Sequence, residues 1–360
     1  MKRVPALDGV RAVAITAVIG LHAFNWPVNG ACGVDIFFVL SGFLITTLLM
    51  NEWAVNGAVH FRGFYARRVR RLLPALVVTI VGYLAVSAAT DHRVGHAALA
   101  GLVAGTYTTN LVVATGHPGL AGALPHTWSL AAEEQFYLLW PAVLFLALRG
   151  RRLPAICLLL AAIAAVTVER RVLAGTLGVS EWRLTGAPDT RSIGLAMGCL
   201  CALCFPELHR LPQSLRRAGS LFGPLALTIV CVALFAAQFD LYRMGGLTIF
   251  CAAVAVLLVR ATSKTSLTAR ALSLAPLVWL GRISYSLYLY HLPIFIAFGV
   301  SGDAVTSRAI VAIALSVTCA ALSFRFVEQP FLRRSSRSRP ARVGSAEVRV
   351  TALEPVGAER

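Results

Sequence analysis

The feature that most constrains this chain is a series of long apolar stretches separated by short polar segments rich in arginine. A helix needs about 20 mostly apolar residues to cross the hydrocarbon core of a bilayer, and eleven stretches approach that length. They centre on residues 10–28, 33–50, 72–90, 97–115, 129–148, 153–171, 191–206, 220–238, 245–260, 276–299 and 306–326. The pattern predicts an all-α protein that crosses the membrane many times.

The composition supports a membrane protein and argues against a nucleic-acid partner. The chain is 58% hydrophobic and 14% charged, whereas a soluble domain averages about 45–50% apolar and about 25% charged residues. Its net charge of +17 comes mainly from arginines, and these lie in clusters between apolar runs that are too short to form a basic groove. Such clusters instead set the orientation of membrane helices.

Cysteines provide no sign of a disulfide framework or a metal centre. Seven of the eight lie within apolar runs, and Cys32 is the exception. The group Cys199, Cys201 and Cys204 resembles a ligand set, but small apolar packing between helices is the simpler interpretation. We therefore expect no metal.

The arginine clusters also predict the topology. A cytoplasmic N-terminus places residues 61–71 inside, in agreement with the positive-inside rule. Eleven full spans would put three later clusters outside, at 149–152, 209–217 and 333–342. Treating 97–115, which contains several threonines and an asparagine, as a re-entrant or partial helix removes these conflicts. We thus expect about ten spans in a plasma-membrane domain (1–332), both termini in the cytoplasm, and a basic, disordered tail (333–360).

Three groups of polar residues fall within the predicted spans, where a charge costs about 2.5–3.5 kcal/mol. Arg11 and His22 are eleven residues apart and therefore share one face of a helix, about 16 Å apart along its axis. Asp8 can pair with Arg11 at i, i+3 spacing. The alternatives are that Arg11 is an interfacial anchor and that His22 is a hydrogen-bonded core residue.

The second group is "PHTWSLAAEEQFYLLWP" (125–141). Glu133 and Tyr137 share a helix face, and the predicted topology puts Glu133 at the depth of His22. A carboxylate facing an imidazole fixes its tautomer and raises its basicity. We predict that Glu133 orients His22 as a general base, although an acid in this position also suits a helix N-terminus.

The third group is "GRISYSLYLYHLPIF" (281–295), in which Ser284, Tyr288 and His291 form one face. An aromatic belt at the membrane interface is the alternative. Asp35 and Arg191 open two other spans from the outer side. We expect Asp35, Tyr137, Arg191, Tyr288 and His291 to contact substrate. The alternative for Arg191 is an anchor that snorkels to the membrane surface.

The cytoplasmic segment "RRVRR" (67–71) is the most concentrated positive charge. Orientation by charge explains part of it. Guanidinium groups also match phosphate oxygens in pairs, so Arg67, Arg70 and Arg71 are candidates for binding a phosphorylated donor.

Several blocks together resemble the acyltransferase-3 family of multipass membrane O-acyltransferases. They are "LDGVRAVAITAVIGLH", "GVDIFFVLSGFLITTLL", "FYARRVRRLLPAL", "WSLAAEEQFYLLWP", "DTRSIGLAMGCLCA", "ISYSLYLYHLPIF" and "FVEQPF", in this order. The resemblance implies transfer of a short acyl group, often acetyl, from acyl-CoA to a hydroxyl. It implies that His22 is the catalytic histidine and Arg11 its motif partner, that Arg67 and Arg70 serve the donor, and that Glu133 is a functional acid accompanied by Tyr137.

The acceptor and the exact mechanism stay open at this point. His22 either removes the proton of the acceptor hydroxyl or carries the acyl group itself. The reaction also needs an oxyanion donor, and Tyr288 or Arg191 could serve. Acceptors in the acyltransferase-3 family, which the blocks resemble, include cell-envelope sugars and sugar-bearing or macrolide natural products. The arginine- and alanine-rich composition and the lack of a polar domain in the sequence favour a natural product. A transporter is the alternative from another class.

Overall fold

The computed structural model describes residues 4–90, 93–150, 152–210, 222–235, 245–263, 266–300, 302 and 305–332. The tail 333–360 and part of the span 220–238 lie outside the described residues. The described chain is helical and contains no strand, so the predicted all-α class is confirmed.

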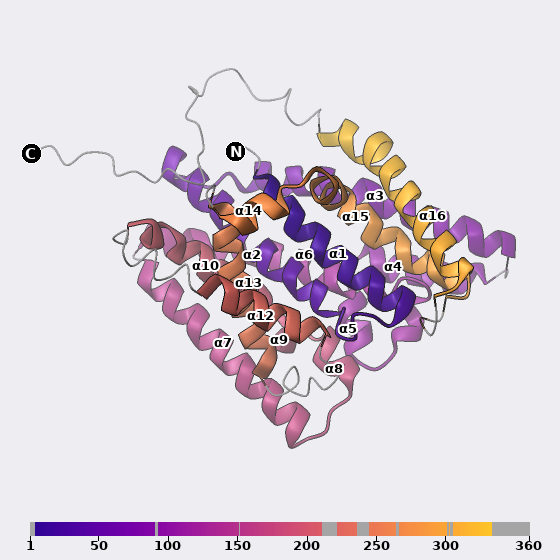
Figure 1. The fold of residues 1–360 in the computed structure, drawn as a ribbon, viewed down its shortest axis with the longest axis horizontal. Helices are drawn as coiled ribbons and strands as arrows, with labels where there is room; N and C mark the ends of the chain where they lie inside the picture. The colour runs from indigo at the N-terminus through magenta and orange to yellow at the C-terminus, as the bar shows by residue number, and fades with distance from the viewer. Residues whose placement is uncertain are drawn as a thin grey trace, which may run out of the picture.

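The predicted spans coincide with helices wherever the chain is described (Figure 1). The longer helices are α1 (Pro5–Phe24), α2 (Cys32–Asn56), α3 (Phe61–Thr90), α4 (Val94–Gly105), α6 (Trp128–Arg149), α7 (Arg152–Gly175), α10 (Ile193–Arg210), α12 (Phe222–Phe235), α13 (Leu247–Thr262), α15 (Ala275–Ala297) and α16 (Ser307–Ser323). Short ones are α5 (Thr109–Ala114), η1 (Pro118–Ala121), η2 (Pro125–Thr127), α8 (Glu181–Gly186), α9 (Pro188–Arg191), α14 (Leu267–Leu272) and the π-helical η4 (Phe324–Glu328).

Six of the described helical segments are long and apolar enough to cross a membrane, and several shorter apolar helices accompany them. The protein is therefore polytopic, while the count of ten spans stays a prediction. The stretch 97–115 is not one helix. It breaks between α4 and α5, where Tyr107 has a positive φ of 54°, and this agrees with the expected partial helix.

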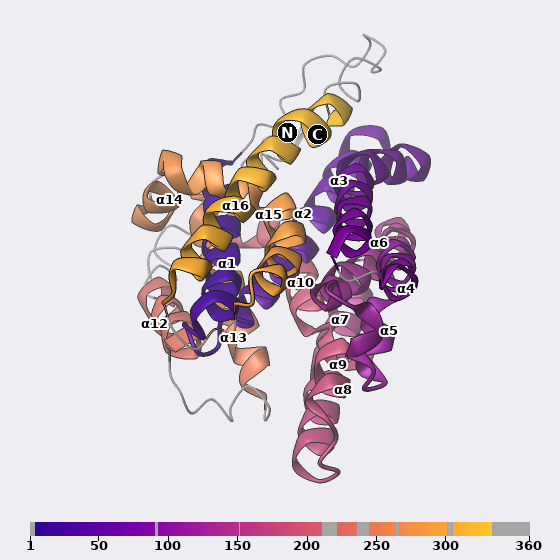
Figure 2. The same ribbon diagram turned by 90° about the vertical axis from the view of Figure 1, so that its right-hand side faces the viewer.

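Helix α2 forms the centre of the molecule. Its most apolar window is 72% buried, whereas that of α7 is only 17% buried. Residues of α2 enter three separate hydrophobic clusters, through Phe43, Phe38 and Leu49 respectively. In Figure 2, α3, α4 and α6 stand at one edge, α12 and α14 at the other, and α2 and α15 between them. The peripheral helices expose the apolar surface that a bilayer would cover.

Glycines allow the central helices to cross closely. A Cβ on Gly42 of α2 would lie 2.1 Å from the carbonyl oxygen of Leu195 in α10. A Cβ on Gly281 of α15 would lie 1.8 Å from the carbonyl oxygen of Asp8 in α1. Small residues at such crossings let helix backbones approach in a membrane. These crossings hold α1, α2 and α15 around the polar residues described next.

Candidate active site

A chamber of about 520 Å³ opens at the end of the molecule where α1, α3 and α15 begin. We name it the arginine chamber because six arginines and only two acids line it. The arginines are Arg11, Arg67, Arg68, Arg70, Arg71 and Arg282, and the acids are Asp8 and Glu328. The fold thus brings the arginines of the segment 67–71 together with Arg11, as the prediction of one donor site requires.

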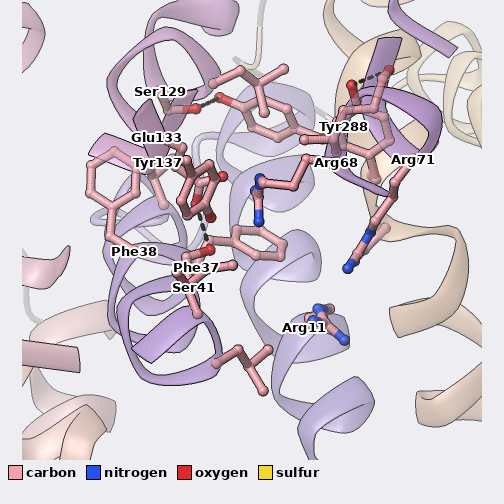
Figure 3. A pocket seen from close by; sticks show the side chains of 17 residues that line it. Arg11, Phe37, Phe38, Ser41, Arg68, Arg71, Ser129, Glu133, Tyr137 and Tyr288 are labelled. Carbon is pink, nitrogen blue, oxygen red and sulfur yellow. Dashed lines mark hydrogen bonds between the residues drawn. The ribbon is translucent and has the colours of Figure 1, made fainter. Parts of the chain in front are cut away.

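A second chamber, of about 120 Å³, adjoins the first. We name it the narrow chamber. Arg11, Arg68, Arg71 and Ser284 line both chambers, and Figure 3 shows the three guanidinium groups facing the same space. Farther along, the wall of the narrow chamber includes Phe37, Phe38, Ser41, Ser129, Glu133, Tyr137 and Tyr288, together with aliphatic side chains. The cavity therefore passes from cationic to mostly aromatic and hydroxyl-bearing walls.

Arg68 lies where the two chambers meet, and its guanidinium is held there by two contacts. Its guanidinium carbon lies 3.2 Å from the centre of the Tyr137 ring, and its Nη2 lies 3.5 Å from Glu134 Oε1. On the other side, Arg11 Nη1 donates to Asp8 Oδ1 at 2.8 Å, which confirms the pair predicted from spacing. Sequence reasoning did not single out Arg68, because arginines within one cluster look alike until the helix rotation is known.

Glu133 lies in the narrow chamber, but its predicted contact with His22 is not formed. Its Oε1 accepts a hydrogen bond of 2.8 Å from the Ser41 hydroxyl of α2 (Figure 3). Glu133 and Tyr137 share a face of α6, as predicted, and both line the chamber. Because α6 turns this face toward α2 and α3, the carboxylate serves the chamber rather than the imidazole at the far end of α1.

His22 is held by its own helix instead. It is half-buried near the end of α1, and its Nδ1 lies 2.9 Å from the carbonyl oxygen of Val18. A carbonyl can only accept, so Nδ1 carries the proton and Nε2 keeps the lone pair in the neutral ring. The backbone thereby fixes the tautomer that a general base requires. We had predicted that Glu133 would do this.

The predicted face of α15 forms a line from the chambers to His22. Ser284 lines both chambers, Tyr288 lines the narrow one, and His291 follows, fully buried. The ring centre of His291 lies 5.5 Å from that of Tyr288 and 5.2 Å from that of His22. His22 itself is not in the wall of either chamber, and His291 connects it to that wall by contacting both His22 and Tyr288.

Tyr288 is not poised as an oxyanion donor. Its hydroxyl donates to the carbonyl oxygen of His126 at 2.6 Å. The hydroxyl of Ser129 lies 2.7 Å away on the other side (Figure 3). Because a phenol has one proton and that proton goes to a carbonyl, the Tyr288 oxygen can only accept from Ser129. The Ser129 hydroxyl also lies 3.5 Å from the same carbonyl oxygen of His126.

His126 is a member of the site that sequence reasoning missed. It is buried in η2, and its ring centre lies 5.2 Å from that of His291 and 5.3 Å from that of Tyr288. It lies at the start of the block 125–141, three residues before Ser129. This position next to other polar residues could have identified it as part of the site. In the described part of the chain no group of three ligating side chains is placed to hold a metal ion.

Asp35 and Arg191, which we expected to contact substrate, pair with each other away from the two chambers. Arg191 Nη2 lies 3.1 Å from Asp35 Oδ2, and the two residues are 3% and 0% exposed. Neither lines the two chambers. Placing both charges in a low-dielectric interior favours their pairing, so the ion pair fastens α9 to α2.

A second ion pair lies in the segment that follows α7. Arg183 of α8 binds Asp189 of α9 through both of its terminal nitrogens. Both side chains are partly exposed. The Arg183 guanidinium holds the pKa of the Asp189 carboxyl below its usual value. This pair stabilises the short helices near the far end of α7.

The fold and the site define a polytopic helical membrane protein with a cationic chamber leading toward buried imidazoles. A family model described as an acyltransferase domain matches residues 4–325, so the chain belongs to this family. The peptidoglycan O-acetyltransferase OatA of Listeria monocytogenes is 34% identical over 91% of this chain and 56% of its own length. The O-acetyltransferase OatA of Staphylococcus aureus is 30% identical over 93% and 58%.

The chain therefore spans a little over half the length of these curated relatives. No solved structure matches it. Membership of the family confirms the resemblance found in the sequence blocks.

Proposed function

We propose that the protein is a membrane O-acyltransferase that moves an acetyl or similar short acyl group from acyl-CoA to a sugar hydroxyl. The observation that carries the proposal is the pair of adjoining chambers, one lined by six arginines and the next by hydroxyl and aromatic groups. Family membership supports the reaction class.

The shape and charge of the chambers suit an acyl-CoA. Small-molecule sites commonly have volumes of about 300–1,000 Å³, and the arginine chamber measures about 520 Å³. Guanidinium forks bind phosphate oxygens in pairs, so Arg67, Arg70 and Arg71 would hold the phosphates of the coenzyme. The narrow chamber would take the thin pantetheine arm, with Arg11 and Arg68 beside it. Cytoplasmic termini, as predicted from the arginine clusters, would open this entrance to the cytosol.

His22 would act as the general base from the opposite end of α1. Its Nε2 lone pair would take the proton of the acceptor hydroxyl as the oxygen attacks the thioester carbon, and the coenzyme would leave as a thiolate. Covalent acylation of His22 is the alternative route. Glu133, Tyr137, Tyr288 and Ser129 would shape the path of the thioester.

We infer a cell-envelope glycan as the acceptor. The two relatives bear the names O-acetyltransferase and peptidoglycan O-acetyltransferase, and this favours an envelope sugar over the natural product that the composition suggested. The half-buried His22, at the end of α1 away from the arginine chamber, would meet that sugar on the outer side.

The test uses the purified full chain in lipid vesicles with radiolabelled acetyl-CoA and soluble peptidoglycan fragments. We expect free thiol to appear together with labelled ester on the glycan. The His22→Ala variant should lose both products, and His117→Ala, a change at an exposed histidine, should keep them. A protein that moves label across the vesicle wall without releasing thiol would be a transporter, contrary to the proposal.

A further inference from the structure

Three imidazoles lie in contact in the order His22, His291, His126. Adjacent ring centres are 5.2 Å apart in both steps. His22 comes from α1, His291 from α15 and His126 from η2, so only the tertiary structure brings them together. The last two rings also contact Tyr288, whose side chain is part of the narrow chamber wall.

A backbone carbonyl fixes the tautomer of every ring. His291 Nδ1 donates to the carbonyl oxygen of Tyr288 at 2.7 Å, and His126 Nε2 donates to that of Leu289 at 3.2 Å. With His22 Nδ1 on Val18, all three N–H groups of the neutral rings are used. Three lone pairs remain, on His22 Nε2, His291 Nε2 and His126 Nδ1.

Two of these lone pairs are buried and lack a partner. His291 Nε2 and His126 Nδ1 make no hydrogen bond, and both residues are almost fully enclosed. Leaving a buried acceptor unsatisfied is unfavourable, because the group loses its hydrogen bonds to water and gains none in the protein. Neutral rings of this kind cannot satisfy one another, because none has an N–H to offer. One added proton would allow an N–H···N bond within the cluster.

On the basis of the proposed function, we propose that His291 and His126 form a proton relay behind His22. The acceptor O–H bond breaks and its proton joins His22 Nε2. That proton passes to His291 Nε2 and then to His126 Nδ1, returning each preceding ring to its neutral tautomer. It finally joins the thiolate sulfur in the narrow chamber, so that the coenzyme leaves as a thiol and no net proton is gained or lost.

The relay accounts for the separation between His22 and the chamber. Acyl transfer releases a proton at the acceptor and consumes one at the sulfur. In this structure His22 lies outside the chamber wall, while His126 and His291 reach Tyr288 within that wall. His291 is thus a positioning residue that acts through His22, whereas His126 delivers the proton to the sulfur.

The test compares the full-length His291→Gln and His126→Gln variants with wild type and with His117→Gln as the control at an exposed histidine. Acyl transfer is measured in vesicles in H₂O and in D₂O. We expect kcat to fall at least about tenfold in both relay variants, since positioned proton transfer contributes about 10²–10⁴-fold. The KM for acetyl-CoA should stay unchanged, because the arginine chamber is intact. The solvent isotope effect on kcat should change relative to wild type.

Folding is checked by thermal unfolding, and His126→Gln decides the outcome if His291→Gln does not fold. Wild-type rates and an unchanged isotope effect in a folded relay variant, alongside an inactive His22→Ala, would overturn the relay and leave the proposed function standing. Absence of transfer by the wild type would overturn both.

Discussion

Two ion pairs show how strongly the surroundings of a charged side chain determine its contribution to the stability of the fold. Asp35–Arg191 is enclosed between α2 and α9, whereas Arg183–Asp189 lies near the surface. Exposed pairs typically contribute about 0–1 kcal/mol. Removing one partner of a buried pair costs about 3–5 kcal/mol, because the remaining charge is left in a poorly solvating interior.

We therefore expect Asp35→Ala to lower the thermal unfolding temperature strongly and to reduce the yield of folded protein. Asp189→Ala is the matched control and should unfold near the wild-type temperature. The measurement is thermal unfolding of the purified chain in detergent. Equal stability of the two variants would show that the buried pair does not fasten α9 to α2.

At the scale of elements, close helix crossings place the polar groups. The backbones of α1 and α15 meet at Asp8 and Gly281, and those of α2 and α10 meet at Leu195 and Gly42. The contact at Gly281 places α15 against α1, with Ser284, Tyr288 and His291 along a line from the arginine chamber to His22.

The Gly281→Ala variant should unfold at a lower temperature and lose acyl transfer, because the new methyl group would lie 1.8 Å from a backbone oxygen that cannot move aside alone. Gly82→Ala in α3 is the control, since a Cβ there meets nothing within 4 Å. Alanine also has the higher helix propensity, by about 1 kcal/mol, so Gly82→Ala should be neutral or stabilising. Wild-type stability of Gly281→Ala would contradict the packing argument.

At the scale of the whole molecule, the proposed acyl-CoA donor requires that the arginine chamber faces the cytosol. The segment 61–71 begins α3 at that end, and residues 176–180 follow α7 at the opposite end (Figure 2). The positive-inside rule gives the same orientation.

Cysteine labelling in whole cells tests this topology. In a background without the exposed Cys157 and Cys231, Thr176→Cys should react with a membrane-impermeant maleimide in intact cells. Arg62→Cys should react only after the membrane is opened. The background chain without either substitution serves as the control. Labelling of Arg62→Cys in intact cells would show that the orientation is the reverse of the predicted one. The arginine chamber would then not open to the cytosol.

The sequence by itself determined the helices and the polar groups that share one helix. The length of an apolar run fixes a span, and a 3.6-residue repeat fixes which residues share a face. The Arg11–Asp8 pair, the Glu133–Tyr137 face and the Ser284–Tyr288–His291 line follow from that repeat and are present in the structure.

Only the tertiary structure decided which helix faces meet. Glu133 contacts Ser41 instead of His22, Asp35 takes Arg191, and His126 joins His291. Periodicity within one helix carries no information about its rotation against the next. That rotation comes from side-chain packing and from crossings such as Gly281 on Asp8, where residues far apart in the chain meet. The contacts between helices therefore appeared only in the folded molecule.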